Sequence, residues 1–321
     1  MPTVLITGGH GGIGFECSRE LATRYGCDLV LAGRSPASME KAAEELTRIS
    51  GARVRLLQLD TSSLASVRDA AAKCRKMLDS GAIDNLQAII CNAGARFFDL
   101  SYSDDGYEKT FATNCLGHFL LMELLVSRLA ADGRIIFTAS GTHDPDTTDG
   151  KLVGKTVEPS AIALANVGKS GEKPLSSGKR YSTSKLCTVL YANELARRLK
   201  KSRSSIASIA FDPGSVPDSG FLRGLPGFVQ WLANSQFMKW LTKRIGVTPG
   251  DLKFSGASLA QLAIDQRFKD DSGKYFQSND LKLIEKRSAS LSYDEHLALR
   301  LWNDSKQLAH LERDEEPALL R

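Results

Sequence analysis

The sequence predicts an α/β fold, a doubly wound parallel sheet (Rossmann-type) of about seven strands with helices on both faces. Strand-like and helix-like segments alternate from the first residues onward, which is the order of a parallel sheet joined by crossover helices. The strand segment at residues 86–91 (LQAIIC) is nearly all apolar, as expected for a strand covered on both faces. A glycine-rich stretch at residues 8–14 joins the first strand directly to the first helix. Right-handed crossovers then place the ligand site at the carboxyl ends of the strands.

The individual elements follow from apolar runs and from apolar residues at helical spacing. The expected strands are residues 3–7, 28–33, 53–59, 86–91, 134–139, 205–211 and 274–277. The expected helices are residues 13–25, 36–49, 62–78, 103–129, 179–201, 251–264 and 294–311. Pro36 suits the first position of its helix, and the serines at 62 and 63 suit the N-cap of the next one.

Two regions interrupt this alternation within a single domain that spans residues 1–321. The insertion at 141–178 is rich in Gly, Asp, Ser, Lys and Pro, and it predicts a long loop or a small subdomain of functional importance. The region 217–250 contains clustered aromatic residues and predicts a lid over a bulky apolar substrate. Its basic and apolar residues at 219–245 also make it a candidate for peripheral membrane contact. Ordinary helices packed on the sheet are the alternative.

Composition excludes several classes of protein. The chain has 321 residues, 42% of them hydrophobic, and a formal net charge of +5 with scattered basic residues, so neither disorder nor nucleic-acid binding is expected. Six cysteines without a C-x-x-C pair predict buried, reduced thiols in a cytoplasmic protein. An N-terminal strand argues against a signal peptide. The sequence contains no run of 18 apolar residues, so a membrane-spanning helix is not expected. The acidic run Asp144, Asp146 and Asp149 lacks the pattern of a calcium loop, so we expect a solvated loop and no metal site.

The glycine stretch has the pattern T-G-x-x-x-G-x-G, with Gly8, Gly12 and Gly14 between a strand and a helix. Glycines at this place allow backbone N–H groups to approach a pyrophosphate at the helix N-terminus; a plain tight turn is the alternative. Arg34 and Ser35 follow the second strand, where a carboxylate would bind a ribose 2′-hydroxyl. A guanidinium suits a 2′-phosphate instead, which favours NADP(H), unless Arg34 is only a surface residue.

A second group of residues predicts acid–base chemistry. Tyr181 and Lys185 are four positions apart on an expected helix, so the phenol and the ammonium share one face. A nearby ammonium lowers the phenol pKa from about 10 toward a working range. Ser140 ends the fifth strand and could bind a substrate carbonyl beside Tyr181, and Asn114 is a polar residue within an apolar helix.

Further segments complete a family resemblance: Leu59-Asp60-Thr61, Asn92-Ala93-Gly94 and Pro213-Gly214-Ser215-Val216. Together with the glycine loop and Tyr-Ser-Thr-Ser-Lys at 181–185, they resemble the short-chain dehydrogenase/reductase family over essentially the whole chain. The resemblance implies a cofactor site formed by Gly8, Gly12, Ile13, Gly14, Arg34, Ser35, Asp60, Thr61, Asn92, Ala93, Gly94, Tyr181, Lys185, Pro213, Gly214 and Val216.

It also implies four catalytic roles. Tyr181 would donate the proton in reduction and accept it in oxidation. Lys185 would hold the nicotinamide ribose and lower the Tyr181 pKa. Ser140 would orient the substrate oxygen, and Asn114 would seat a water in a proton relay. Asp60 and Thr61 would lie by the adenine.

Within the family, the sequence is most similar to light-dependent protochlorophyllide reductases and retinol dehydrogenase-like enzymes. The run at 114–121 (NCLGHFLL), the 41 positions from Ser140 to Tyr181 and the C-terminal segment 298–308 carry this similarity. Asp212 and Ser215 stand where the protochlorophyllide reductases have tyrosine and cysteine, which favours a dark reductase.

The predicted function is therefore hydride transfer between NADP(H) and a carbonyl or alcohol of a bulky apolar small molecule, with Tyr181 as general acid/base. The alternatives are reduction of a C=C bond in a pigment-like macrocycle, and a non-catalytic NADP-binding sensor or scaffold. A monomer is expected because the insertion would obstruct the outer face of the helix that carries Tyr181; a homo-oligomer is the alternative.

Overall fold

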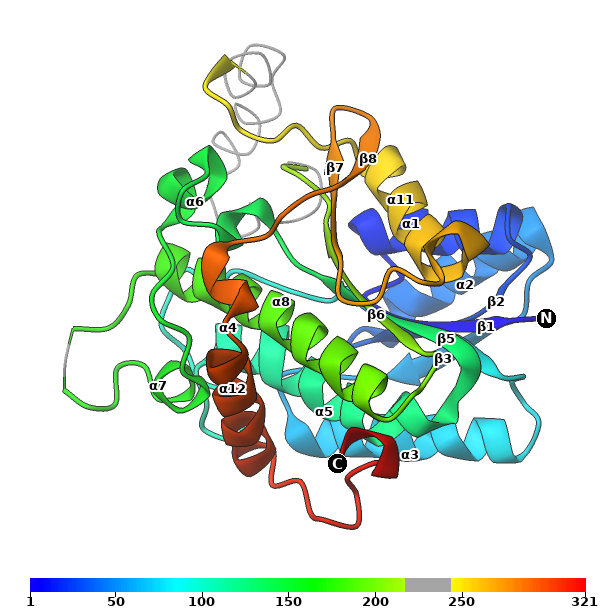
Figure 1. Ribbon diagram of the computed structural model, residues 1–321. Helices are drawn as coiled ribbons and strands as arrows, with labels where there is room; N and C mark the ends of the chain where they lie inside the picture. The colour runs from blue at the N-terminus through cyan, green and yellow to red at the C-terminus, as the bar shows by residue number, and fades with distance from the viewer. Residues whose placement is uncertain (172, 217–243) are drawn as a thin grey trace.

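The computed structural model describes residues 1–171, 173–216 and 244–321 (Figure 1). Its centre is an eight-stranded sheet of order β3-β2-β1-β4-β5-β6-β7-β8. The strands are β1 Thr3–Thr7, β2 Asp28–Gly33, β3 Val54–Gln58, β4 Leu86–Cys91, β5 Leu129–Thr138, β6 Ala207–Asp212, β7 Tyr275–Asn279 and β8 Lys282–Glu285. Strands β1 to β7 pair in parallel, which confirms the doubly wound prediction. The eighth strand was not predicted: β8 folds back on β7 as an antiparallel edge.

Helices cover both faces of the sheet (Figure 1). They are α1 Gly12–Thr23, α2 Pro36–Ser50, α3 Leu64–Asp79, α4 Lys109–Phe111, α5 Gly117–Leu125, α6 Thr148–Val153, α7 Ala161–Ala165, α8 Ser177–Lys201, α11 Leu252–Ile264 and α12 Glu295–Leu308. Helices α1, α2 and α11 lie on one face, whereas α3, α5 and α8 lie on the other with α12 against α8.

The strands divide their side chains between two apolar cores. In β1, Leu5 belongs to the core beneath α3, α5 and α8, whereas Val4 and Ile6 belong to the core beneath α1, α2 and α11. Successive side chains of a strand point to opposite faces, so a strand covered on both faces buries nearly all of its side chains and is expected to be mostly apolar. This burial explains the continuous apolar runs that identified the strands in the sequence.

The expected helix at 103–129 is shorter and less regular than predicted. The α-helical part begins at Lys109, because Glu108 forms a β-bridge with Tyr102 and its carboxylate accepts the Phe111 N–H at 2.8 Å. A π-helical turn over 112–116 follows, and β5 already begins at Leu129. Residues 109–128 are long and apolar enough to cross a membrane by length and composition, yet 94% of their most apolar window is buried in the protein, as in a core helix.

The two expected irregular regions differ in what the structure describes of them. The insertion contains a 3₁₀ turn, Gly141–His143, and the short helices α6 and α7, so it is a small folded subdomain. Of the predicted lid, residues 217–243 lie outside the described residues, as does most of the proposed membrane-contact segment. Residues 244–250 are described, and Pro249 pairs with Ser215 in an isolated bridge.

Two predictions about side chains can be compared directly with the structure. All six cysteines are buried and free, which confirms the expectation of buried thiols. The expectation of a solvated acidic loop is wrong for Asp149, which is buried. Its carboxylate accepts hydrogen bonds from the Thr248 hydroxyl at 2.8 Å and the Thr248 N–H at 3.2 Å, and these bonds hold α6 against the segment that precedes α11.

Candidate active site

The glycine loop forms a tight passage from β1 into α1. Gly8 and Gly12 have φ of +68° and +54°, conformations that glycine adopts without strain. A β-carbon on Gly14 would lie 2.2 Å from the Gly8 carbonyl oxygen and 2.7 Å from Asn92 Nδ2. In contrast, a β-carbon on Gly11 would meet nothing within 4 Å. The loop therefore has close backbone packing on one side and open space on the other.

This loop fits the pyrophosphate of a dinucleotide. Gly11 caps α1 without any side-chain hydrogen bond, whereas side chains cap α2, α3, α8 and α11. The first-turn N–H groups of α1 therefore lack a side-chain acceptor, and no acidic residue occupies that turn. Backbone donors at a helix N-terminus are favourable for an anionic group. Ile13, beside these donors, packs into the apolar core.

Thr7 connects the glycine loop to the residues that follow β4 and to His118. Its Oγ1 accepts the N–H groups of Asn92 and Ala93, both at 2.9 Å, and lies 2.9 Å from His118 Nε2. The Thr7 hydroxyl proton has two acceptors within reach, His118 Nε2 and the Ile90 carbonyl at 3.3 Å, and donation to the nearer Nε2 requires the tautomer with the proton on Nδ1. His118 Nδ1 then donates to the Asn114 carbonyl at 3.3 Å. Burial lowers the pKa of His118 to about 4, which keeps the ring neutral.

The residues expected at the adenine end lie where β2 and β3 finish. Arg34 is exposed next to the end of β2. Ser35 caps α2 by accepting the Ser38 N–H at 3.4 Å, so its hydroxyl already has a structural partner. Asp60 accepts the N–H and the hydroxyl of Ser62 at 2.9 and 2.7 Å, and Thr61 is buried beside it.

Asn114 joins the segment after β4 to α8, the helix that carries Tyr181. Its Oδ1 accepts the Ala95 N–H at 2.9 Å, and its Nδ2 donates to the Ala95 carbonyl and to Ser184 Oγ, both at 3.0 Å. Ser184 in turn donates to the Tyr181 carbonyl at 2.7 Å. Gly94 leaves room at this point, since a β-carbon there would lie 3.2 Å from Asn114 Oδ1 and 3.4 Å from Lys185 Nζ. The structure thus brings Gly94, Asn114 and Lys185 together.

Tyr181 and Ser140 meet at the carboxyl end of β5. Tyr181 is buried and hydrogen-bonded to the Ser140 side chain. Burial raises the pKa of Tyr181 to about 12, against a lowering by the Ser140 hydrogen bond and by the charge of Arg96. This direction differs from the prediction that Lys185 lowers the phenol pKa.

The difference has a geometric cause. Lys185 Nζ lies 5.8 Å from the centroid of the Tyr181 ring and donates to the Thr138 carbonyl at 2.8 Å. Burial lowers the pKa of Lys185 to about 8. Desolvation therefore dominates both groups in this structure, and the cation that lowers the Tyr181 pKa is Arg96.

The Pro213-Gly214-Ser215-Val216 turn is held by backbone bonds and by Asp212. Asp212 is fully buried, and its carboxylate accepts the Gly214 N–H at 2.9 Å, Gln277 Nε2 at 2.6 Å and the Tyr275 hydroxyl at 3.1 Å. Ser215 donates its N–H to the Thr248 carbonyl at 2.8 Å. The sequence marked Asp212 only as a departure from relatives. Its anchoring role depends on residues from β7, more than 60 positions away.

Sequence reasoning also missed Arg180, next to Tyr181. This buried guanidinium forms an ion pair with Glu108 at 3.0 Å and donates to the carbonyls of Phe97, Asp99 and Leu175 at 2.9 to 3.0 Å. It fixes the loop that carries Arg96. An arginine at the start of a helix is ordinary in a sequence, so only its burial shows that it is structural.

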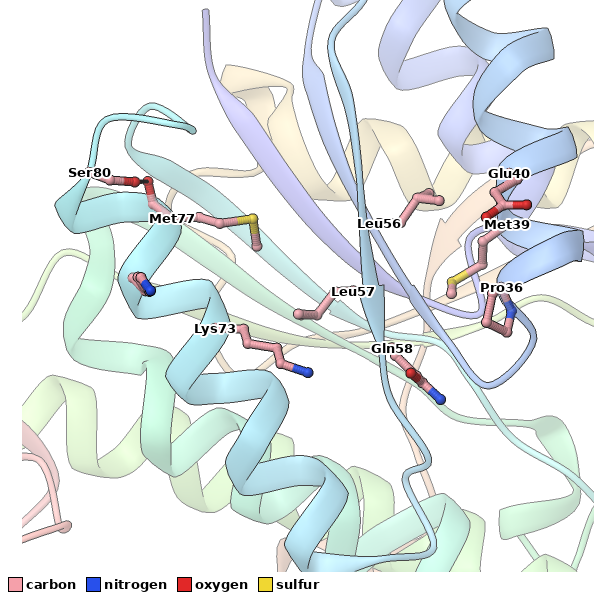
Figure 2. Close-up of a pocket in the computed structure, with 10 residues that line it drawn as sticks. Pro36, Met39, Glu40, Leu56, Leu57, Gln58, Lys73, Met77 and Ser80 are labelled. Carbon is pink, nitrogen blue, oxygen red and sulfur yellow. Dashed lines mark hydrogen bonds between the residues drawn. The ribbon is translucent and has the colours of Figure 1, made fainter.

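A separate groove lies at the β3 edge of the sheet. Figure 2 shows it between α2 and α3, lined by Met39, Leu56, Lys73 and Met77 among others. It contains none of the expected catalytic residues. Within residues 1–171, 173–216 and 244–321, no group of three or more His, Cys, Asp or Glu side chains is arranged to hold a metal ion.

Comparisons with known proteins agree with this geometry. Residues 2–146 match the family model described as short chain dehydrogenase. Human retinol dehydrogenase 13 is 31% identical over 314 residues, which cover 97% of this chain and 85% of that protein. The chain therefore belongs to the short-chain dehydrogenase family, whose members are oxidoreductases with a nicotinamide cofactor.

Solved structures agree on the fold. A crystal structure of a protein from Mycobacterium paratuberculosis superposes with a TM-score of 0.69 at 24% identity, over 97% of this chain and 94% of that chain. L-Sorbose reductase from Gluconobacter frateurii, solved with NADPH and L-sorbose, gives a TM-score of 0.62 at 16% identity, over 87% of this chain and 95% of that chain.

Proposed function

We propose that the protein is an NADP(H)-dependent oxidoreductase that reduces a carbonyl group of a bulky apolar substrate, with Tyr181 as general acid/base. The observation that carries the proposal is the buried Tyr181 hydroxyl, hydrogen-bonded to Ser140 with Lys185 one helical turn away. Bound NADPH would supply the hydride. The glycine loop, residues 92–94 after β4 and the turn at 213–216 would hold this cofactor.

The protonation state of Tyr181 suits the role of proton donor in reduction. With its pKa near 12, the Tyr181 phenol keeps its proton at neutral pH and can donate it to a substrate oxygen. The Ser140 hydroxyl donates a hydrogen bond to the same substrate oxygen and orients it toward Tyr181. Lys185 attaches the N-terminal part of α8 to β5 through the Thr138 carbonyl. The positive charge of Arg96, which lowers the Tyr181 pKa, stabilises the negative charge left on Tyr181 after proton transfer.

Two features support the choice of cofactor and substrate. Arg34 stands at the end of β2 with no carboxylate at that position, which suits a 2′-phosphate. Retinol dehydrogenase 13 is named for a large apolar alcohol, and L-sorbose reductase was solved with NADPH. An apolar substrate agrees with the aromatic composition of residues 217–250.

The test compares wild type with Tyr181→Phe. NADPH and NADH oxidation are followed with retinals, ketones, quinones and protochlorophyllide, in darkness and under illumination. Tyr25→Phe is the matched control, because Tyr25 lies after α1, outside the site. We expect dark turnover with NADPH that falls about 100- to 10,000-fold in Tyr181→Phe, while NADPH binding is retained.

Other outcomes contradict the proposal in different ways. Turnover only under illumination favours reduction of a C=C bond in a pigment. NADPH binding without turnover on any substrate favours a sensor or scaffold. Equal activity of Tyr181→Phe and Tyr25→Phe rules out Tyr181 as the acid.

A further inference from the structure

His143 is a buried imidazole directly behind the catalytic serine, and no expected role accounts for it. It ends the 3₁₀ turn that follows Ser140, and only 2% of its surface is exposed. Its Nδ1 lies 2.7 Å from the Ser140 carbonyl oxygen, and its Nε2 lies 3.0 Å from the backbone nitrogen of Ala289.

These two contacts define the tautomer. A backbone N–H can only donate, so Nε2 must accept from Ala289 and carries no proton. A carbonyl oxygen can only accept, so Nδ1 must carry the proton and donate to Ser140. Burial lowers the pKa of His143, in agreement with a neutral ring.

The imidazole joins segments that are far apart in the sequence. The Tyr275 ring of β7 lies 5.0 Å from the His143 ring, centroid to centroid. Ala289 lies in the segment between β8 and α12, which is itself attached to α8 because Asn193 Nδ2 donates to the Ser292 carbonyl at 2.8 Å. Ser140 and the helix that carries Tyr181 are therefore connected through His143 and residues 289–292.

We infer that His143 is a positioning residue, which aligns the Ser140 hydroxyl with Tyr181 by fixing the Ser140 backbone to the segment that ends in α12. The inference rests on the proposed function for the roles of Ser140 and Tyr181. The Nδ1–H bond acts on Ser140 itself, and the Nε2 bond only holds the ring and the C-terminal segment. Loss of the first bond should impair chemistry, and loss of the second should impair stability.

Two substitutions separate the bonds. The carboxamide of His143→Asn lies near the Nδ1 position and can still donate to Ser140, while the carboxamide of His143→Gln lies near the Nε2 position and can still accept from Ala289. His296→Gln, on the exposed part of α12, is the matched control. Thermal unfolding of each variant measures the folded fraction.

The first readout is kcat on the best substrate from the carbonyl panel. We expect His143→Gln to lose about 10- to 100-fold in kcat, since small misalignment of reacting groups has effects of this size, with little change in cofactor KM. His143→Asn should recover most of kcat but unfold at a lower temperature. Equal loss in both variants, in proportion to unfolded protein, would show that His143 only fills space and would overturn the inference.

The second readout needs no substrate or cofactor. Phenolate absorbance after a rapid alkaline pH jump, taken as the difference from Tyr181→Phe, reports the Tyr181 pKa. Because the Ser140 hydrogen bond lowers that pKa, His143→Gln should raise it as Ser140→Ala does, and the two changes should not add. An unchanged pKa in His143→Gln overturns the inference. Absence of turnover in wild type together with the expected rise contradicts the proposed function alone.

Discussion

The two halves of the site are built from different materials. Around the glycine loop, positions are determined by backbone atoms and small side chains: a β-carbon on Gly8 would lie 3.3 Å from Asn92 Nδ2, and one on Gly14 would lie 2.7 Å from it. Around Tyr181, positions are determined by buried ionisable or polar side chains, such as Lys185, His143 and Asp212. The first half is constrained sterically, because there is no room for larger side chains. The second half is constrained by the hydrogen-bond and charge partners of each buried group.

This difference teaches where each half is vulnerable. A buried polar group is costly without a partner, so the Tyr181 side should lose stability when a substitution removes one member of a hydrogen-bonded network. The glycine side should lose stability when a substitution adds a side-chain atom. His118 contacts both halves, through Thr7 on the glycine side and Asn114 on the Tyr181 side.

The largest effect is expected for Arg180→Met. This change leaves the Glu108 carboxylate buried without its guanidinium, and three backbone carbonyls lose a donor. We expect the free energy of unfolding to fall by about 3–5 kcal/mol, measured by urea denaturation. Arg267→Met is the control, because its ion pair with Asp265 is exposed; its midpoint should stay near that of wild type. Similar losses in both variants would contradict the contrast.

The second prediction concerns the pH dependence of stability through His118. Its folded-state pKa of about 4 lies below the usual value of 6.5, so the unfolded chain binds the extra proton between these values. The contribution of His118 to the free energy of unfolding is therefore fully present above about pH 6.5. It falls by about 3 kcal/mol as the pH drops toward 4. His118→Gln cannot take up that proton. The difference in unfolding free energy between wild type and His118→Gln should shift by this amount over that pH range, and a constant difference would contradict the prediction.

The sequence predicted the features that have local signals and missed those that depend on distant partners. Strand runs, the helix-forming segments and the glycine loop were predictable because their signals are local: period, length and turn chemistry. β8 was missed because a four-residue edge strand has no pattern of its own and exists only by pairing with β7. The roles of Arg180, His143 and Asp212 were not predictable, since each depends on partners distant in the chain.

A smaller effect is expected for Gly14→Ala. The added β-carbon would lie 2.2 Å from the Gly8 carbonyl oxygen, so the loop or α1 must shift, at a cost of about 1–3 kcal/mol in unfolding free energy. NADPH binding, followed by fluorescence, should weaken as well. Gly11→Ala is the matched control: Gly11 has an extended φ of −161° and open space around its Cα. If Gly11→Ala destabilises the fold as much, close packing is not what selects glycine at position 14.

The smallest effect is expected at the outer end of the cofactor site, where neither kind of constraint applies. Arg34 is exposed, so Arg34→Ala should leave stability unchanged. If its guanidinium binds a 2′-phosphate, NADPH affinity should fall about tenfold, or about 1.4 kcal/mol, while NADH affinity stays the same. Titration of both cofactors against wild type and Arg34→Ala measures the selectivity directly, with Arg48→Ala on α2 as a control for net charge. An equal loss for both cofactors would mean that Arg34 contributes general attraction rather than recognition. In that case any preference for NADPH must come from elsewhere in the site, because the two neighbouring residues expected there, Ser35 and Asp60, carry no positive charge.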